Sequence, residues 1–343
     1  MKRHECIASI IPPHANSRHH AQAYAPTNIA LIKYWGKRDK TLNLPTNDSL
    51  SLSINPLGCQ TYIQVNHHAQ QHSWQHNKQI VTPTTPRFQR LSRFLDEIKP
   101  VKDIYYAIHT ESNVPMAAGI ASSACGFAAL VKALDQLHEW HLSRSQMSIL
   151  SRMASGSACR SLWPGFVQWH RGDADNGLDS HGEKLPIEWP ELQMGLFLID
   201  HQSKKIGSTE AMNITQQTSP LFKKWPHQAH LDLEQLKSAL EQKNFWDLGE
   251  VLENNACLMH ECMETSSPSI CYSTPTTLML RQEIQACRRQ GLPIFFSQDA
   301  GPNLKCFFLQ QSLREVQMRF PNLIHINPHQ EKHCPLKPLI EQE

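Results

Sequence analysis

Residues 115–124 read Pro115-Met-Ala-Ala-Gly-Ile-Ala-Ser-Ser-Ala124 and continue directly into Cys125-Gly-Phe-Ala-Ala-Leu-Val-Lys-Ala-Leu134. Small residues dominate the first half, whereas good helix formers with an apolar stripe dominate the second. The pattern predicts a glycine-containing loop leading into a helix N-terminus, where free N–H groups and the helix dipole suit an anion. A tightly packed helix would have a similar composition, so both interpretations stay open at this point. A Walker A loop is excluded, because no Gly-Lys-Ser/Thr triplet follows.

The composition predicts a cytoplasmic protein. The chain has 343 residues and a formal charge of +2, without the basic patch and interleaved aromatics that a nucleic-acid partner requires. Its apolar runs are shorter than the ~18–20 residues of a membrane span, so we expect no membrane partner. Residues 1–23 are expected to form a mobile N-terminal leader, because the apolar run 7–11 is too short for a signal peptide. The ten cysteines lack a regular framework and are expected to stay reduced.

Strands and helices are predicted along the whole chain without βαβ regularity, which indicates the α+β class. We expect strands at residues 25–35, 50–54, 61–65, 104–109, 165–169, 193–199, 292–296 and 304–309. Helices are expected at 87–98, 143–153 and 274–289. A further helix is expected to begin at 209, and the segment 231–263 is expected to be helical with a break near Asn244. The histidine-rich segment 66–77 is interpreted as a solvated hairpin. A change of composition after Pro190 divides the chain into an N-terminal lobe, 24–190, and a C-terminal lobe, 191–343.

Four basic residues accompany the small-residue turns and suggest a site for several phosphates: Lys33, Lys37, Arg87 and Arg160. Arg160 stands out because it follows Ser155-Gly-Ser-Ala-Cys159, a stretch suited to burial, and a buried arginine needs an anionic partner. Asp299 ends an apolar strand, where a turn role and a catalytic role are equally consistent with the pattern. Cys257, His260 and Cys262 match no standard zinc spacing, so core packing is favoured for them.

Five motifs in this order resemble the GHMP kinase superfamily and, within it, the mevalonate diphosphate decarboxylases. The matching segments are Asn28-Ile-Ala-Leu-Ile-Lys-Tyr-Trp-Gly-Lys-Arg-Asp39, Leu44-Pro-Thr-Asn-Asp-Ser-Leu-Ser51, Ala117-Ala-Gly-Ile-Ala-Ser-Ser-Ala124, Ser155-Gly-Ser-Ala-Cys-Arg-Ser-Leu162 and Asp299-Ala-Gly-Pro-Asn303. Weaker similarity occurs at 208–212 and at Met259-His260, and the likeness extends from about Tyr24 to Leu309.

The resemblance implies a two-lobed GHMP kinase-like fold with the active-site cleft between the lobes. It implies ATP-dependent decarboxylation of mevalonate 5-diphosphate to isopentenyl diphosphate, carbon dioxide, ADP and phosphate, in a protein that is commonly a homodimer. The partners are then small molecules: mevalonate 5-diphosphate, and ATP as co-substrate. Magnesium follows from the phosphoryl transfer, since the phosphate charge must be neutralised, and no protein ligand for a metal is assigned.

The resemblance also implies roles for individual residues. Asp299 faces the 3-hydroxyl as base or orienting group, Lys33 holds Asp299 ionised, and Arg160 clamps the substrate carboxylate or a phosphate. The residues expected around the substrate are Tyr34, Lys37, Arg87, Gly156, Ser157, Arg160, Ser208 and Met212. The loop expected to wrap the ATP phosphates comprises Gly119, Ile120, Ala121, Ser122 and Ser123.

Several positions depart from the family pattern, which leaves the substrate preference open: Asp48, Met116, Trp163-Pro164, Ala211 and Gln298. The alternatives are a phosphomevalonate decarboxylase, a mevalonate 3-kinase-type relative and a non-catalytic nucleotide-binding homologue. The presence of both Lys33 and Asp299 disfavours a kinase-only relative. Loss of Asp299, Lys33 or Arg160 would have indicated the non-catalytic homologue, and all three are present. Use of the monophosphate stays open.

Overall fold

The computed structural model of the chain describes residues 2–13, 18–114, 122–200 and 206–330. Helices and strands are mixed along this part of the chain, so the predicted α+β class is confirmed. The larger sheet is antiparallel apart from the pairing of β5 with β7, and its order is β6-β5-β7-β4-β8-β9 with β1 also on β4. Its strands are β1 (His20–Ile32), β4 (Ser49–Val65), β5 (Ser73–His76), β6 (Gln79–Ile80), β7 (Tyr106–Ser112), β8 (Gly165–Trp169) and β9 (Gly182–Lys184).

The smaller sheet has the order β11-β12-β10-β13 and is built from the C-terminal half of the chain. Its strands are β10 (Leu192–Phe197), β11 (Ile294–Gln298), β12 (Leu304–Leu309) and β13 (Ile324–Ile326). A separate short ribbon pairs β2 (Lys37–Asp39) with β3 (Leu44–Pro45). Because β12 pairs with both β10 and β11, its residues lie in the interior of this sheet.

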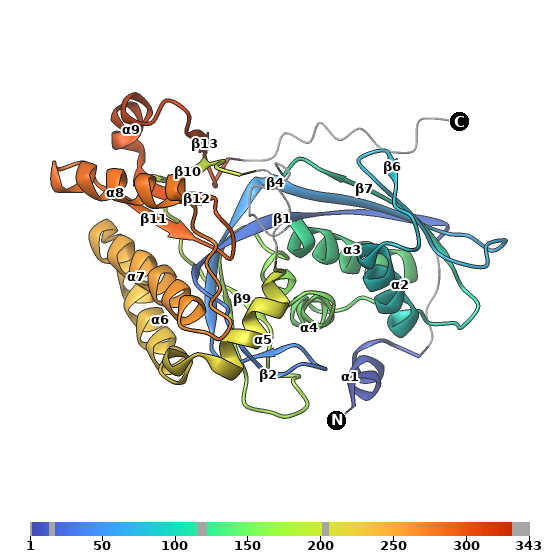
Figure 1. The fold of residues 1–343 in the computed structure, drawn as a ribbon. Coiled ribbons are helices and arrows are strands. Elements are labelled where there is room, and N and C mark those ends of the chain that lie inside the picture. Colours follow the sequence, from blue (N-terminus) through green and yellow to red (C-terminus); the bar gives the residue numbers. More distant parts are fainter. Residues whose placement is uncertain (1, 14–17, 115–121, 201–205, 331–343) are drawn as a thin grey trace.

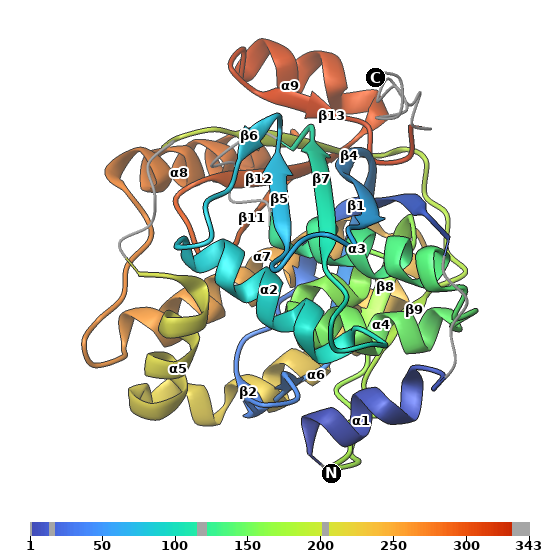
Figure 2. The same ribbon diagram turned by 90° about the vertical axis from the view of Figure 1, so that its right-hand side faces the viewer.

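The helices gather at the two ends of the molecule, with α2, α3 and α4 at one end and α6, α7 and α8 at the other (Figure 1). Figure 2 shows β5, β6 and β7 side by side above α2. The helices are α1 (Arg3–Ile10), α2 (Pro86–Ile98), α3 (Ser122–His138), α4 (Arg144–Ala154), α5 (Ser208–Thr218), α6 (Trp225–Glu241), α7 (Phe245–Glu264), α8 (Pro275–Arg289) and α9 (Leu313–Arg319). Short 3₁₀ turns occur at Gly156–Arg160, Pro220–Lys223 and Gln310–Ser312.

Local sequence signals explain where the main helices begin. Thr85 caps α2 by accepting from the backbone N–H of Phe88, and Pro86 occupies the first helical position. Ser143 opens α4 with a capping box. The side chain of Asn244 accepts from the backbone N–H of Asp247 and starts α7 three residues after α6 has ended. The predicted break near Asn244 is therefore confirmed.

Two predictions about the larger sheet are wrong. Residues 50–54 and 61–65 belong to one strand, β4, because residues 55–57 form a bulge opposite β1: Pro26 pairs with Gly58 and Thr27 with Ile54. The segment 66–77 is not only a solvated hairpin. Its residues 73–76 form β5, which pairs in parallel with β7, and the buried ring of His72 accepts from the backbone N–H of Tyr106 at 3.1 Å.

The described part of residues 1–23, for which a mobile leader is predicted, contains packed secondary structure. Helix α1 buries Cys6, Ile7 and Ile10 in the same core as α2, α3 and α4. Strand β1 already begins at His20. Cys6 and Ile7 lie four and three positions before Ile10, so the three side chains share the face of this short helix that covers the core.

The apolar core does not divide at residue 190. One cluster joins Ile29, Leu31 and Trp35 to the inner faces of α6 and α7, so β1 packs against helices of the C-terminal half. A second cluster lies under α2, α3 and α4, and a third lies between α8, α9 and the smaller sheet. The boundary between lobes at 190 and 191 therefore stays a prediction, and the shared core joins the two parts tightly.

Candidate active site

Asp299 lies between two lysine side chains that reach it from different parts of the fold. Its Oδ1 is 2.7 Å from Nζ of Lys33, and its Oδ2 is 2.8 Å from Nζ of Lys305. Lys33 directly follows β1, whereas Asp299 opens the turn between β11 and β12, the strand that carries Lys305. Both lysines are buried, but the Asp299 side chain keeps 27% of its surface exposed. The predicted contact of Lys33 with Asp299 is present, and Lys305 is a member of this cluster that sequence reasoning missed.

The charges around Asp299 determine its ionisation. Burial opposes ionisation, but the ammonium groups of Lys305 and Lys33 outweigh it and hold the pKa of Asp299 well below its usual range. Burial also lowers the pKa of Lys33, and the adjacent Asp299 carboxylate counteracts that effect. At neutral pH, Asp299 is therefore a carboxylate.

Neighbouring elements fix the backbone on both sides of this cluster. The N–H of Lys33 donates to Asn255 Oδ1 in α7 at 2.8 Å, and the carbonyl of Lys33 accepts from Asn47 Nδ2 at 2.9 Å. Nε2–H of His260, also in α7, donates to the backbone carbonyl of Asp299 at 3.2 Å. His260 is buried, as its predicted packing role requires, and it also contacts the turn that begins at Asp299.

Arg160 lies in the 3₁₀ turn after α4 and is buried, as its sequence context predicts. Its guanidinium donates to Ser49 Oγ and, at 3.5 Å, to Asn28 Oδ1, and it lies 5.7 Å from the centre of the Trp169 ring. Its Nε has no hydrogen-bond partner, and no carboxylate within the described residues forms an ion pair with it. Burial lowers the pKa of Arg160, so this cation is held at a cost that an anionic ligand would offset.

Tyr34 and Gly156 lie beside Arg160. A Cβ on Gly156 would come within 2.8 Å of the Tyr34 ring, so this close approach requires glycine. The Tyr34 hydroxyl is buried and has no partner among the described residues. Ser157, the next residue, is tied in place through its carbonyl, which accepts from Asn28 Nδ2 at 3.1 Å. The structure therefore brings Tyr34, Gly156, Ser157 and Arg160 together.

Lys37 lies on β2, where Gln216 of α5 bonds both of its backbone groups, at 2.9 and 2.8 Å. Burial, followed by the nearby cations Arg90 and Lys40, lowers the pKa of Lys37 to about 8. Arg90 of α2 donates through Nε and Nη2 to the carbonyl of Ala154, immediately before the 155–160 turn. Arg90 is thus a second residue that sequence reasoning missed.

Arg87, the α2 residue predicted for the substrate site, points elsewhere. It is exposed, and its guanidinium lies 5.6 Å from the centre of the Trp74 ring. Ser208 is an exposed residue at the start of α5, and Met212 is buried in the core. Within the described residues, no hydrogen bond or ion pair joins Arg87, Ser208 or Met212 to Asp299.

The predicted phosphate loop is described only where it enters α3. Gly119, Ile120 and Ala121 lie outside the described residues, and Ser122 is the first residue of α3. The exposed Ser123 has its Oγ 3.4 Å from Oγ of Ser155. The N-terminus of α3 therefore lies next to the turn that carries Arg160, where helix N–H groups can face an anion.

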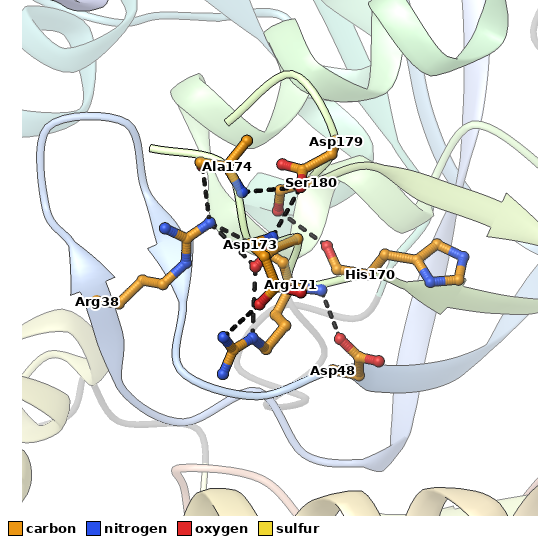
Figure 3. A network of polar contacts seen from close by, with 9 residues as sticks. Arg38, Asp48, His170, Arg171, Asp173, Ala174, Asp179 and Ser180 are labelled. Carbon is orange, nitrogen blue, oxygen red and sulfur yellow. Dashed lines mark hydrogen bonds and ion pairs between the residues drawn. The ribbon is translucent and has the colours of Figure 1, made fainter. Parts of the chain in front are cut away.

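Polar contacts hold the loop after β8 against β2 and the segment before β4 (Figure 3). Asp48 Oδ1 accepts from the backbone N–H of Arg171 at 2.5 Å. Arg38, next to Lys37, donates to three loop carbonyls, including Ala174 at 3.2 Å. Asp179 Oδ2 accepts from the N–H groups of Asp173 and Ala174, closing the loop on itself. Asp48, a departure from the family pattern, thus has a structural role.

The described residues contain neither a cluster of metal ligands nor a membrane-spanning helix. Nowhere in this part of the chain do three His, Cys, Asp or Glu side chains gather as metal ligands would. None of the described helices combines the length and the apolar character that crossing a membrane requires.

Two buried lysines on one carboxylate, together with a buried arginine that has no ion-pair partner within the described residues, indicate a site for a small polyanion. Residues 25–182 match the family model described as diphosphomevalonate decarboxylase-like N-terminal domain, and residues 196–341 match the mevalonate 5-diphosphate decarboxylase C-terminal domain. The chain belongs to the diphosphomevalonate decarboxylase family, as its motifs predict.

Individual relatives agree with this assignment. The chain is 34% identical over 303 residues to diphosphomevalonate decarboxylase of Candida albicans, covering 84% of each chain. It is 32% identical over 313 residues to the Saccharomyces cerevisiae enzyme of the same name, covering 85% of this chain and 78% of that one.

Among solved structures, mevalonate diphosphate decarboxylase of Staphylococcus aureus superposes with a TM-score of 0.84 at 32% identity, covering 90% of this chain and 95% of that one. A structure described as MDDEF in complex with MVAPP, AMPPCP and magnesium has the same TM-score and identity, with 89% and 95% covered. These likenesses in structure confirm the predicted fold class.

Proposed function

We propose that the chain catalyses the ATP-dependent decarboxylation of mevalonate 5-diphosphate, forming isopentenyl diphosphate, carbon dioxide, ADP and phosphate. The family assignment supports this reaction, and so does the relative solved with MVAPP, AMPPCP and magnesium. The observation that carries the proposal is the charge of the site: within the described residues, Lys33 and Lys305 share the carboxylate of Asp299, and the buried Arg160 has no ion-pair partner.

That charge imbalance favours a polyanionic ligand. Each buried, unmatched cation costs several kcal/mol of desolvation, and an anion that enters the site recovers this energy. The proposed substrate carries a carboxylate and a diphosphate, and ATP adds a triphosphate. Arg160, with an unbonded Nε, is assigned to the substrate carboxylate or to a phosphate.

Asp299 is assigned to the tertiary 3-hydroxyl of the substrate. A general base works best when its pKa lies near the working pH, and the two lysines hold the pKa of Asp299 far below that value. The ion pairs therefore favour the orienting role over the base role. Lys33 keeps Asp299 ionised, and Ser157 and Gly156 shape the wall beside Arg160.

The substrate diphosphate is assigned to the area around Tyr34 and Lys37. Arg90 is added to this group because its guanidinium lies beside the 155–160 turn, and it replaces Arg87 in our assignment. Ser208 and Met212 keep their predicted place near the diphosphate. The loop from Gly119 to Ser123 is assigned to the ATP phosphates.

Magnesium fits these residues as an ion bound with ATP. Mg²⁺ keeps several waters and uses one or two carboxylates together with substrate phosphates, so the lack of an acidic cluster within the described residues is compatible with it. When bound, it supplies neutralisation of the phosphate charge during transfer.

We also propose that the active site lies in the cleft between the two lobes, that the enzyme is cytoplasmic and that it forms a homodimer. The contact of Lys33 with Asp299 across 266 positions of sequence supports the first statement. The lack of a regular cysteine framework supports the second, and the family resemblance supports the third.

The proposal is tested by a product assay with purified protein and Mg-ATP. Mevalonate 5-diphosphate and 5-phosphate are supplied separately, and carbon dioxide and ADP are measured together, with Asp299→Asn as the inactive control. Equal release of both products from the diphosphate supports the proposal. ADP without carbon dioxide would identify a 3-kinase, preference for the monophosphate would identify a phosphomevalonate decarboxylase, and nucleotide binding without turnover would favour a regulatory homologue.

A further inference from the structure

Lys305 is a charged residue within an apolar strand. It lies in β12, Leu304-Lys-Cys-Phe-Phe-Leu309, which forms the interior of the smaller sheet. Its backbone neighbours are Leu196 on β10 and Ser297 on β11, and the residue is buried. A buried lysine is costly unless its ammonium group has a well-placed partner, and Asp299 Oδ2 provides one at 2.8 Å.

Each of the two lysines contacts a different oxygen of the Asp299 carboxylate. Lys33 contacts Oδ1 and directly follows β1 of the larger sheet, whereas Lys305 contacts Oδ2 and lies on β12 of the smaller sheet. The terminal torsion of an aspartate is broad and roughly two-fold, so a single ion pair leaves the carboxylate plane free to turn. A bond to each oxygen, from two rigid elements, fixes that plane.

We infer that Lys305 is a positioning residue of the reaction, which holds the Asp299 carboxylate ionised and in one orientation together with Lys33. This inference rests on the proposed function, in which Asp299 contacts the reacting hydroxyl. Lys305 acts through Asp299, and the exposed part of the Asp299 side chain is what remains for the substrate.

The charged and titratable groups facing Asp299 come from four elements. They are Lys33 after β1, Lys305 on β12, Arg160 in the 3₁₀ turn and His260 on α7. Burial lowers the pKa of His260 to about 3, so it is neutral at physiological pH. Burial raises the pKa of Asp299, and Lys305 and Lys33 lower it. Removal of Lys305 leaves fewer cations to offset burial, so the pKa of Asp299 must rise.

The test uses the full chain with Lys305→Met, Lys305→Arg and a matched control, Lys132→Met. Lys132 is a partly buried lysine on α3 whose ammonium donates to the carbonyl of Tyr24 at 2.6 Å. We expect Lys305→Met to lower kcat by about tenfold or more, a part of the 10²–10⁴ assigned to a positioned acid–base group, and to leave the KM for ATP within about threefold. We expect its kcat to fall at the acid end of a profile from about pH 4 to about pH 8, where the parent stays active.

The arginine variant separates charge from geometry. Because Lys305→Arg keeps the charge, it is expected to fold and to show the parent's pH profile, but with a lower kcat, since the planar guanidinium meets Oδ2 in a different geometry. A parental kcat and pH profile in Lys305→Met, or the same loss in Lys132→Met as in Lys305→Met, would overturn the inference. A parental kcat in Lys305→Arg would overturn its orienting part.

A turnover-independent measurement distinguishes failure of this inference from failure of the proposed function. The infrared carboxyl band lost in Asp299→Asn reports protonation of Asp299, and we expect it at higher pH in Lys305→Met than in the parent. If Asp299 becomes protonated at the same pH in Lys305→Met as in the parent, the inference is overturned, and this result does not depend on which substrate the enzyme uses. Absence of carbon dioxide release by the parent would overturn the proposed function alone.

Discussion

Replacing Arg160 by methionine separates a ligand-binding cation from a structural one, because the chain offers a matched control. Arg152, in the last turn of α4, is also buried, but its guanidinium donates to the carbonyls of Leu42, Gly177 and Ser180. Arg160 donates only to Ser49 Oγ and weakly to Asn28 within the described residues.

The two substitutions should therefore affect stability differently. Arg152→Met removes a donor from three buried carbonyls and leaves those of Leu42 and Ser180 without a hydrogen bond within the described residues, because Gly177 still accepts from the N–H of Ser180. At about 1–3 kcal/mol for each unsatisfied carbonyl, we expect the free energy of unfolding to fall by about 2 kcal/mol or more. Arg160→Met loses weaker bonds but removes a cation whose burial costs several kcal/mol. We expect its free energy of unfolding to stay within about 1 kcal/mol of the parent value.

Catalysis should show the reverse order. Loss of a desolvated charge pair with a ligand costs about 2–5 kcal/mol, which corresponds to about a 30- to 4,000-fold loss of kcat/KM for Arg160→Met. Stability is measured by urea unfolding, and binding by the rise in melting temperature on adding mevalonate 5-diphosphate, which Arg160→Met should largely abolish. If Arg160→Met unfolds as easily as Arg152→Met while keeping the parent's kcat/KM, Arg160 is structural and the charge argument fails.

Three further outcomes follow from the site. Asp299→Asn should lower kcat by about 10²–10⁴ while both substrates still bind, and near-normal turnover would remove Asp299 from the mechanism. Because the pKa of Lys37 is lowered to about 8, the KM for the diphosphate should rise as pH increases through that value and Lys37 loses its charge. Lys37→Met should raise KM at neutral pH and remove this dependence, whereas a flat parent profile would contradict the assignment. Gly156→Ala should reduce kcat/KM by displacing Tyr34, whereas Gly126→Ala, whose added Cβ meets nothing within 4 Å, should not; equal kinetics in the two variants would refute the packing argument.

Local chemistry made most helices and strands predictable, but long-range contacts decide the site. Thr85, Ser143 and Asn244 mark helix starts through caps that depend on a few neighbouring residues. The contact of Lys33 with Asp299 spans 266 positions, and it was expected from the family motifs rather than from periodicity. The bulge at 55–57 joins the two segments predicted as separate strands, 50–54 and 61–65, because Pro and Gly occur at bulges as well as between strands.

The two missed cations show what a sequence pattern leaves undetermined. Arg87 and Arg90 lie three residues apart on α2, and the choice between them depends on how α2 packs against the end of α4, where Arg90 meets Ala154. Lys305 did carry a signal, because a lysine inside the apolar strand 304–309 requires a buried partner. Which carboxylate that partner is follows only from the pairing of β11 with β12.

The core shared by β1 and the C-terminal helices has a consequence for synthesis of the chain. Trp35 packs in the same cluster as Trp225, so some 190 residues must be made between the two halves of this contact. At about 5–20 residues per second, the ribosome needs roughly 10–40 s for that interval. During this time the apolar end of β1 is uncovered on the nascent chain. The interval between synthesis of Lys33 and of Asp299 is longer, because 266 positions separate them. The core around Trp35 can therefore be completed only after the segment that carries Trp225 has emerged from the ribosome.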